Sequence, residues 1–274
     1  MLDHQLIYRQ SAQAYDLLVT REDVHCNLLK AIQWILPLEG RRVVETGAGT
    51  GRLTRLLASH VRFIMGLDAS AAMLQVAAAC LPGRILVVAD HRHLPVPGSC
   101  ADLVLSGWSL CYLVNPGTNW QTEVSKALCE MERVLKPGGV MLIIETLVTG
   151  YAFPTPPEKL IPYYDFLEKS GFSFIWIRTD YQFSSPEEAV QLTRFFFGDE
   201  LARSLEATSS TTLLECTGLW CCLLYTSDAA DDLLCVDLGG RRIIKKKKTK
   251  KKLAVTILHI ITHHTEHCIY STHS

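Results

Sequence analysis

A glycine-rich loop, Gly47-Ala-Gly-Thr-Gly51, is the part of the sequence most suited to chemistry, and Glu45 precedes it. Glycines let backbone N–H groups approach a ligand closely, and a helix that follows directs its first N–H groups at the same point. A dinucleotide fingerprint needs the spacing G-x-G-x-x-G. Here the third glycine comes one residue early, and Arg52 stands in its expected position. The spacing therefore favours a nucleotide cofactor of another kind.

Further candidate residues follow the next apolar runs along the chain. Asp68 ends a second run, where an acid can accept hydrogen bonds from both hydroxyls of a ribose. Asp68 could instead cap a helix, with Ser70 as the rival cap. Asp90 ends a third run, and Trp108 with Ser109 follow a fourth. Ligands bind outside the carboxyl ends of the strands in an open α/β sheet, so these residues would meet there.

The elements that must position these residues are strands of continuous apolar character that alternate with helices. This pattern predicts an α/β fold with a doubly wound, seven-stranded, mostly parallel sheet and N-terminal helices. The strands are expected at residues 42–46, 63–68, 85–90, 101–106, 140–145, 172–183 and 212–220. Helical patterns cover residues 2–36, 52–59, 70–80, 122–135, 156–170 and 185–205, the last opened by Ser184 or Ser185 as cap.

The motif Glu-x-Gly-x-Gly-x-Gly at residues 45–51 resembles the first motif of class I S-adenosylmethionine-dependent methyltransferases. The order of the other elements is similar, because Asp68 stands where the family has its ribose-binding acid and Ala89-Asp90 where it contacts adenine. The turn Arg133-Val-Leu-Lys-Pro-Gly-Gly139 before the fifth strand is also typical of the family. Thr46 replaces an aliphatic residue that is frequent there. The resemblance covers residues 15–145 and is closest to bacterial small-molecule enzymes of the methyltransferase-11 type.

This resemblance implies that S-adenosyl-L-methionine is the cofactor and that a small molecule accepts the methyl group. The expected cofactor-binding residues are Tyr15, Glu45, Thr46, Gly47, Ala48, Gly49, Thr50, Gly51, Asp68, Ala69, Met73, Ala89, Asp90, His91, Trp108 and Ser109. A general base is needed only if the acceptor is a protonated oxygen, nitrogen or carbon acid. Glu145, Tyr163 and His91 are the candidates for that base. We predict no metal site, since His91 and His93 have no third ligand near them in the sequence.

Two other functions remain open, a nicotinamide-dependent oxidoreductase and a non-catalytic relative that binds the cofactor. A nucleic-acid partner is not expected, because the chain up to Trp220 has 18 Lys and Arg against 23 Asp and Glu. The family's amino-methylation motif is also absent, with Ser106-Gly-Trp-Ser109 in its place. The sequence has no run of about 18 apolar residues, so we predict no membrane helix. We expect a cytoplasmic monomer or homodimer.

The composition changes after Trp220. From Cys221 onward there are 9 basic and 5 acidic residues, and seven of the twelve lysines fall within Lys245–Lys252. Back-translated, residues 222–232 and 236–244 resemble a transposon-end adapter used for sequencing libraries, and the lysines resemble a translated adenine run. We therefore predict an N-terminal helical cap at 1–40, a cofactor-binding methyltransferase domain at 41–220, and a non-native, disordered tail at 221–274. The overall net charge of −1 then averages an acidic body and a basic tail.

Overall fold

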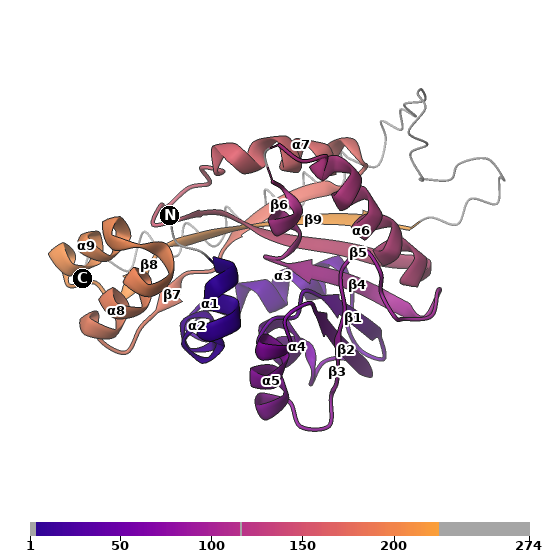
Figure 1. Ribbon diagram of the computed structural model, residues 1–274, viewed down its shortest axis with the longest axis horizontal. Coiled ribbons are helices and arrows are strands. Elements are labelled where there is room, and N and C mark those ends of the chain that lie inside the picture. Colours follow the sequence, from indigo (N-terminus) through magenta and orange to yellow (C-terminus); the bar gives the residue numbers. More distant parts are fainter. Residues whose placement is uncertain (1–3, 116, 225–274) are drawn as a thin grey trace. The chain divides into compact units, whose positions relative to one another are not determined.

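One mixed sheet organises the computed structural model, which describes residues 4–115 and 117–224 (Figure 1). Its strands are β1 (Arg42–Thr46), β2 (Phe63–Asp68), β3 (Ile85–Val88), β4 (Ala101–Gly107), β5 (Leu135–Thr149), β6 (Ser173–Arg178) and β9 (Glu215–Leu223). The strand order is β3-β2-β1-β4-β5-β9-β6. Strands β1 to β5 pair in parallel, and β9 is antiparallel to both β5 and β6. The predicted seven-stranded, mostly parallel sheet is confirmed.

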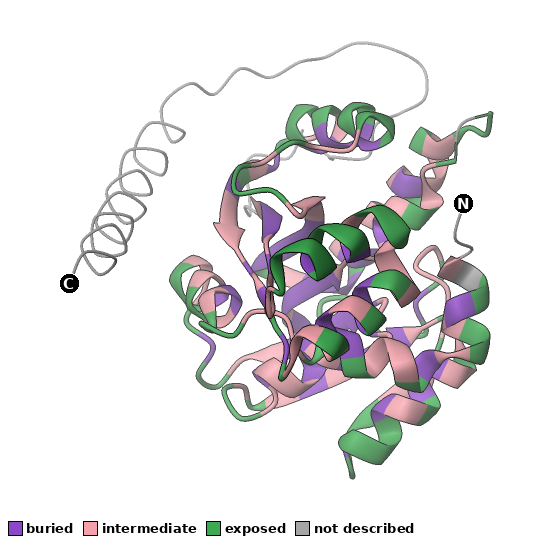
Figure 2. Ribbon diagram, turned by 90° about the vertical axis from the view of Figure 1, so that its left-hand side faces the viewer, coloured by how far each residue is buried: buried purple, intermediate pink, exposed green. Residues whose placement is uncertain are grey.

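Helices cover both faces of the sheet, as the burial of its central strands requires. Leu103, Val104 and Leu105 are successive residues of β4, point alternately to opposite faces, and are all buried. Figure 2 shows these buried strands between helices whose outer sides are exposed. The helices between the parallel strands are α4 (Arg52–Leu57), α5 (Ala71–Cys80) and α6 (Trp120–Val134), and η1 (Leu110–Leu113) is a short 3-10 helix.

The N-terminal helical pattern is divided into three helices, α1 (His4–Gln10), α2 (Ala12–Val19) and α3 (Asn27–Ile35). Asp23 and Cys26, between α2 and α3, both have positive φ angles. The carboxylate of Asp23 accepts hydrogen bonds from the backbone N–H groups of Asn27 and Leu28, at 2.8 and 2.9 Å. The Asp23 carboxylate thus supplies hydrogen-bond acceptors for two free N–H groups in the first turn of α3. The chain therefore turns there and begins a new helix.

The C-terminal elements are also shorter than the patterns suggested. The helical pattern at 185–205 forms α8 (Pro186–Phe197) and α9 (Asp199–Thr208), separated by Gly198 with φ +97°. Of the two possible caps, the hydroxyl of Ser185 accepts the backbone N–H of Glu188 at 3.2 Å. The run at 172–183 is divided into β6 and the short strand β7 (Tyr181–Gln182), which pairs with β8 (Thr212–Leu213) in a separate two-stranded sheet.

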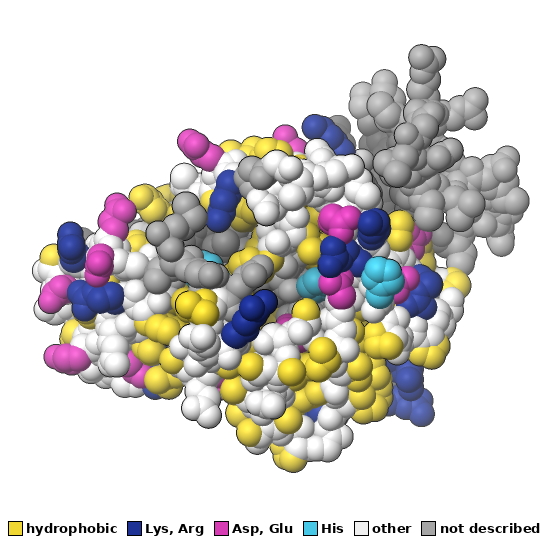
Figure 3. All heavy atoms as spheres, in the orientation of Figure 1, with side chains coloured by type: hydrophobic (Ala, Val, Ile, Leu, Met, Phe, Trp, Pro, Cys, Tyr) yellow, Lys and Arg dark blue, Asp and Glu magenta, His cyan; other side chains and the backbone are white. Residues whose placement is uncertain are grey.

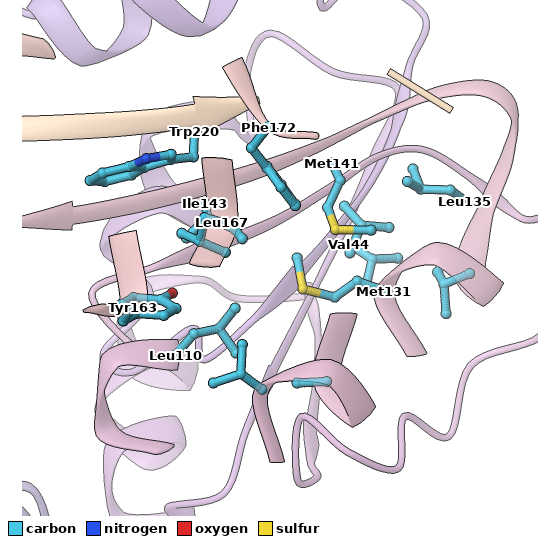
Figure 4. Close-up of a cluster of buried hydrophobic side chains, with 14 of the residues drawn as sticks. Val44, Leu110, Met131, Leu135, Met141, Ile143, Tyr163, Leu167, Phe172 and Trp220 are labelled. Carbon is cyan, nitrogen blue, oxygen red and sulfur yellow. The ribbon is translucent and has the colours of Figure 1, made fainter. Parts of the chain in front are cut away.

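The main apolar core lies where α6 and α7 (Ile161–Lys169), preceded by η2 (Glu158–Leu160), pack on the sheet. Figure 4 shows Met131 and Leu167 from these helices beside Ile143 of β5 and Trp220 of β9. Trp220 is 1% exposed and stacks on Tyr164, with ring centroids 4.5 Å apart. The core thus fixes β5 and β9, the two longest strands of the sheet.

Strand β9 continues to Leu223, three residues beyond the boundary predicted at 220. Cys221 and Cys222 pair with Leu142 and Met141 of β5, so the first residues of the adapter-like segment belong to the sheet. The rest of the tail, from residue 225, and with it the prediction of disorder, lies outside the described residues. Within residues 4–115 and 117–224, no helix is long and apolar enough to cross a membrane.

Candidate functional site

A cavity of about 630 Å³ lies at the carboxyl ends of β1, β2 and β4, where the sequence placed its candidate residues. This edge is the usual ligand site of an open α/β sheet. Of the predicted cofactor-binding residues, the cavity is lined by Tyr15, Glu45, Gly47, Ala48, Gly49, Thr50, Asp68, Ala69, Met73, Asp90, His91, Trp108 and Ser109. The remaining three, Thr46, Gly51 and Ala89, are not among the residues that line it.

The glycine loop is fixed to the end of β2 by its own backbone. The N–H groups of Gly47 and Ala48 both donate to the carbonyl of Leu67, at 2.7 and 2.8 Å. Gly47 has φ +77°, and a Cβ atom there would lie 2.0 Å from the Ser109 hydroxyl oxygen. Only glycine therefore allows the loop and the segment after β4 to approach so closely.

Asp68 holds the loop from the neighbouring strand. One carboxylate oxygen accepts the backbone N–H of Gly49 at 2.8 Å, and the other accepts that of Ser70 at 2.7 Å. Burial raises the pKa of Asp68 above its ordinary value, although both hydrogen bonds oppose the shift. The rival cap, Ser70, is the N-cap of α5, because its hydroxyl accepts the N–H of Met73 at 3.4 Å. Asp68 is thus available at the cavity wall beside the loop.

Three polar side chains form a chain of hydrogen bonds across the cavity wall. His91 Nδ1 shares a hydrogen bond with Thr46 Oγ1 at 2.5 Å, and His91 Nε2 shares one with Ser109 Oγ at 2.8 Å. Burial lowers the pKa of His91 to about 4. The imidazole is therefore neutral at pH 7, with one nitrogen as donor and the other as acceptor. Thr46 does not touch the cavity but orients the histidine that does.

Two acids at the cavity have pKa values shifted in opposite directions. Burial raises the pKa of Glu45 to about 8, and its carboxyl group accepts a hydrogen bond from the Thr54 hydroxyl. Hydrogen bonds from Arg92 hold the pKa of Asp90 at about 2. Arg92 binds both oxygens of Asp90, at 2.7 and 2.6 Å, and also pairs with Glu123. At pH 7 Glu45 is predominantly protonated, whereas Asp90 is an anion already neutralised by its neighbour.

Two of the three candidate bases lie away from the cavity. Glu145 and Tyr163 are both 0% exposed, and the Tyr163 hydroxyl donates to Glu145 Oε1 at 3.2 Å. The same oxygen accepts the backbone N–H of Cys111 in η1 at 3.0 Å. Figure 4 shows Tyr163 within the apolar core, beside Leu110 and Leu167. The geometry brings only His91, of the three, to the cavity.

The cavity also contains residues that the motif did not identify. Tyr8, Arg9, Arg52 and Tyr112 line it together with the predicted Tyr15. The hydroxyls of Tyr8 and Tyr112 share a hydrogen bond at 2.5 Å, and the ring of Tyr8 meets that of Tyr15 edge to face at 5.1 Å. These tyrosines come from α1, α2 and η1, and Figure 1 shows α1 and α2 next to α8. The N-terminal helices thus form an aromatic cover over one side of the cavity.

Arg52 was visible in the sequence as the residue directly after the glycine loop. Its guanidinium carbon lies 3.9 Å from the centre of the Trp108 ring, and its Nη1 donates to Glu22 Oε2 at 2.6 Å. Burial acts to lower the pKa of Arg52, but the charge and the hydrogen bond of Glu22, together with Tyr181 and Tyr15, outweigh it, and the pKa is raised. The described residues contain no group of three His, Cys, Asp or Glu side chains that could hold a metal ion.

The glycine loop and most of the residues that line the cavity lie within a part of the chain that matches a known protein family. Residues 44–143 match the model of a methyltransferase domain family, which spans β1 to the middle of β5 and includes the glycine loop, Asp68 and His91. This match and the sheet order together support a class I S-adenosylmethionine-dependent methyltransferase domain, as the sequence predicted. The family also confirms the predicted cofactor class.

Relatives with sequence similarity carry methyltransferase names. An uncharacterized methyltransferase of Mycobacterium tuberculosis is 34% identical over 110 residues, which are 40% of this chain and 42% of that protein. A demethylmenaquinone methyltransferase of Clavibacter sepedonicus is 34% identical over 130 residues, 46% of this chain and 47% of that protein. The chain thus spans about half the length of the curated relatives it matches.

A solved structure shows the same fold. A phosphoethanolamine N-methyltransferase of Haemonchus contortus superposes with a TM-score of 0.51 and 16% identity, over 83% of this chain and 61% of that one. At this level of identity the likeness concerns the fold alone.

Proposed function

We propose that this chain binds S-adenosyl-L-methionine in the cavity at the ends of β1, β2 and β4 and transfers its methyl group to a small-molecule acceptor. The observation that carries the proposal is the contact between Asp68 and Gly49, because it joins the family's ribose-binding acid to the glycine loop at one wall of the cavity. S-adenosylmethionine, when bound, supplies a methyl group already activated by a positively charged sulfur.

The residues present fit a nucleoside with a charged side arm. A cavity of about 630 Å³ lies within the usual range for cofactor sites. Glycine at position 47 lets the loop lie against the segment after β4, because an added Cβ there would meet Ser109 and His91. Gly47, Ala48, Gly49 and Thr50 of this loop line the cavity. Asp68 is the acceptor for ribose hydroxyls, and the segment Ala69–Met73 with Asp90 and His91 forms the adjoining wall.

The chain's own part in the reaction is to orient the acceptor and exclude water, since alignment supplies much of the rate of a direct displacement. Tyr8, Tyr15 and Tyr112 line the same cavity as the glycine loop. His91 is the base we propose if the acceptor carries a proton, because it is the one of the three candidates that lines the cavity, and Thr46 fixes its orientation. Glu145 and Tyr163 act at a distance, by holding the N–H of Cys111 and so the position of η1.

We propose a small molecule as acceptor, and neither a nucleic acid nor a membrane. Support comes from the names of two relatives, a demethylmenaquinone and a malonyl-[acyl-carrier protein] methyltransferase. The face of the molecule in Figure 3 carries basic and acidic side chains that alternate, without a continuous basic patch. Nucleic-acid binding would favour such a patch. We further propose a cytoplasmic protein that is a monomer or homodimer.

Calorimetry of the full chain with S-adenosylhomocysteine and with NADH tests the proposal. Binding of S-adenosylhomocysteine alone supports it, whereas binding of NADH alone would favour the oxidoreductase. A screen of acceptors with methyl-labelled cofactor then separates an enzyme from a non-catalytic relative. Cofactor binding without transfer to any of a broad set of phenols, amines, thiols and carbon acids would favour the non-catalytic relative.

A further inference from the structure

The backbone of Trp108 has an uncommon conformation for a residue with a large side chain. Trp108 follows the last residue of β4 and has φ +48°, in the left-handed region that favours glycine. Its N–H donates to the carbonyl of Ile144 at 2.7 Å, which anchors the backbone on the neighbouring strand. Such a conformation is strained for a residue with a Cβ atom. Contacts of the side chain must therefore help to keep the indole in the cavity wall.

Arg52 supplies the main contact of this kind. Its guanidinium group lies over the indole, 3.9 Å from the ring centre, a distance at which the cation is attracted to the ring face. Arg52 opens α4 directly after Gly51, so the stacking joins the glycine loop to the segment after β4. Both residues line the same cavity.

Glu22 fixes the guanidinium from the other side. Its Oε2 accepts from Arg52 Nη1 at 2.6 Å, and its Oε1 accepts from the Thr179 hydroxyl at 3.0 Å. The Glu22 side chain is only 2% exposed, so the ion pair is shielded from water. Removal of one partner from such a pair leaves an unpaired charge and is costly. Glu22 follows α2, the helix that carries Tyr15 over the cavity.

We propose that Arg52 is a positioning residue, which fixes the indole of Trp108 in the wall of the cavity and is itself held by Glu22. The proposal rests on the proposed function, since Arg52 and Trp108 both line the cavity in which we propose that the cofactor binds. The cofactor loop, the wall after β4 and the segment after α2 are thus joined at one side chain. A lysine at position 52 keeps the charge but loses the planar stacking surface.

A double-mutant cycle on the full chain tests this role, with S-adenosylhomocysteine as the probe in calorimetry. We expect Arg52→Lys to weaken binding about tenfold in the native chain and to have little further effect when Trp108 is already alanine. Arg21→Lys is the matched control, because Arg21 pairs with Glu188 at 2.6 Å, the same distance as Arg52 and Glu22, but is not among the residues that line the cavity. It should bind the probe like the native chain.

Quenching of tryptophan fluorescence by acrylamide gives a second readout that needs no ligand. The chain has five tryptophans, so Trp108→Phe supplies the signal of the other four. We expect Arg52→Lys to raise the quenchable fraction in the native chain but not in the Trp108→Phe background. Equal quenching with and without Arg52 would overturn the proposal, as would a loss of affinity that persists in the alanine background. Failure of the native chain to bind the probe would instead contradict the proposed function.

Discussion

The carboxylate of Asp68, at the end of β2, accepts the backbone N–H of Gly49 in the loop after β1 at 2.8 Å. This contact joins two neighbouring strand ends and fixes the loop beside the acid. A group that both organises the loop and faces the cavity affects the binding of a ligand in two ways. It can contact the ligand directly, and it keeps the glycine backbone in place.

Replacement of Asp68 by alanine should therefore weaken the binding of S-adenosylhomocysteine by roughly 10- to 100-fold, the usual cost of removing a charged hydrogen-bond partner. Titration calorimetry measures the change. Glu168→Gln, at an exposed position on α7, is the control and should leave the affinity unchanged. Equal affinity in the Asp68→Ala variant and the native chain would exclude the ribose-binding role.

Replacement of Gly47 by alanine should reduce both stability and ligand affinity, because the new Cβ would meet the Ser109 hydroxyl. Gly83 is a matched control, with φ +76° against +77° at Gly47, and no atom of residues 4–115 and 117–224 lies within 4 Å of an added Cβ. Gly83→Ala should cost about 1 kcal/mol for its backbone strain alone, and Gly47→Ala about 1–3 kcal/mol more. Urea unfolding measures both.

The crowding at Gly47 can also be relieved directly. Replacement of Ser109 by glycine in the Gly47→Ala chain removes the two atoms nearest to the new Cβ, so part of the lost stability should return. If the double variant is no more stable than Gly47→Ala alone, the close approach to Ser109 is not the cause of the loss.

The stability of the native chain should fall as the pH rises from about 5 to 7, because of Glu145. Burial raises the pKa of Glu145 to about 7, well above its ordinary value of 4.5. The folded state therefore binds the proton more tightly, and this contribution is present at low pH and is lost as the pH rises towards 7. Glu145→Gln, a mimic of the protonated acid, should remove a loss of about 2 kcal/mol between pH 5 and pH 8. Urea unfolding at both pH values measures the loss of unfolding free energy. An equal loss in the native chain and in Glu145→Gln would contradict the prediction.

His91 should give the opposite dependence. Its pKa is about 4 in the folded chain and 6.5 in the unfolded one, so the unfolded state binds the proton more tightly between these values. Stability should be complete above pH 6.5 and fall as the solution is acidified towards pH 4. We expect His91→Gln to reduce the loss between pH 7 and pH 5 by about 1–2 kcal/mol. His60→Gln, at an exposed position, is the control and should behave like the native chain.

Features that depend on residues close together in the sequence could be predicted from the sequence alone. The glycine loop, Asp68 and the alternation of strands and helices follow from local spacing, and the structure places them as predicted. Glu145 shows where local reasoning fails. The fifth strand was expected to end there, which would place Glu145 at the ligand edge. Pairing of Thr149 with Glu215 of β9 extends the strand by four residues, so Glu145 lies in its interior.

The contacts of Arg52 could not be predicted for a related reason. Its partner Glu22 is 30 residues away along the chain and is directed to it by the positive-φ turn at Asp23. Nothing in the periodicity of residues 2–36 marks that turn. The aromatic cover could not be predicted for the same reason. Tyr15 contacts Phe196 of α8, with ring centroids 5.3 Å apart, although the two residues are far apart in the sequence. Long-range pairs of this kind are set by the packing of whole elements.

The position of β9 between β5 and β6 has a consequence for synthesis of the protein. Strand β6 pairs only with β9 in the sheet, yet it precedes β9 by about forty residues in the chain. During translation, β1 to β5 can assemble as soon as they leave the ribosome, because each finds its neighbour among earlier residues. Strand β6 must wait with an unpaired edge until residue 223 emerges. The nascent chain is therefore most exposed to aggregation in the interval between these two strands.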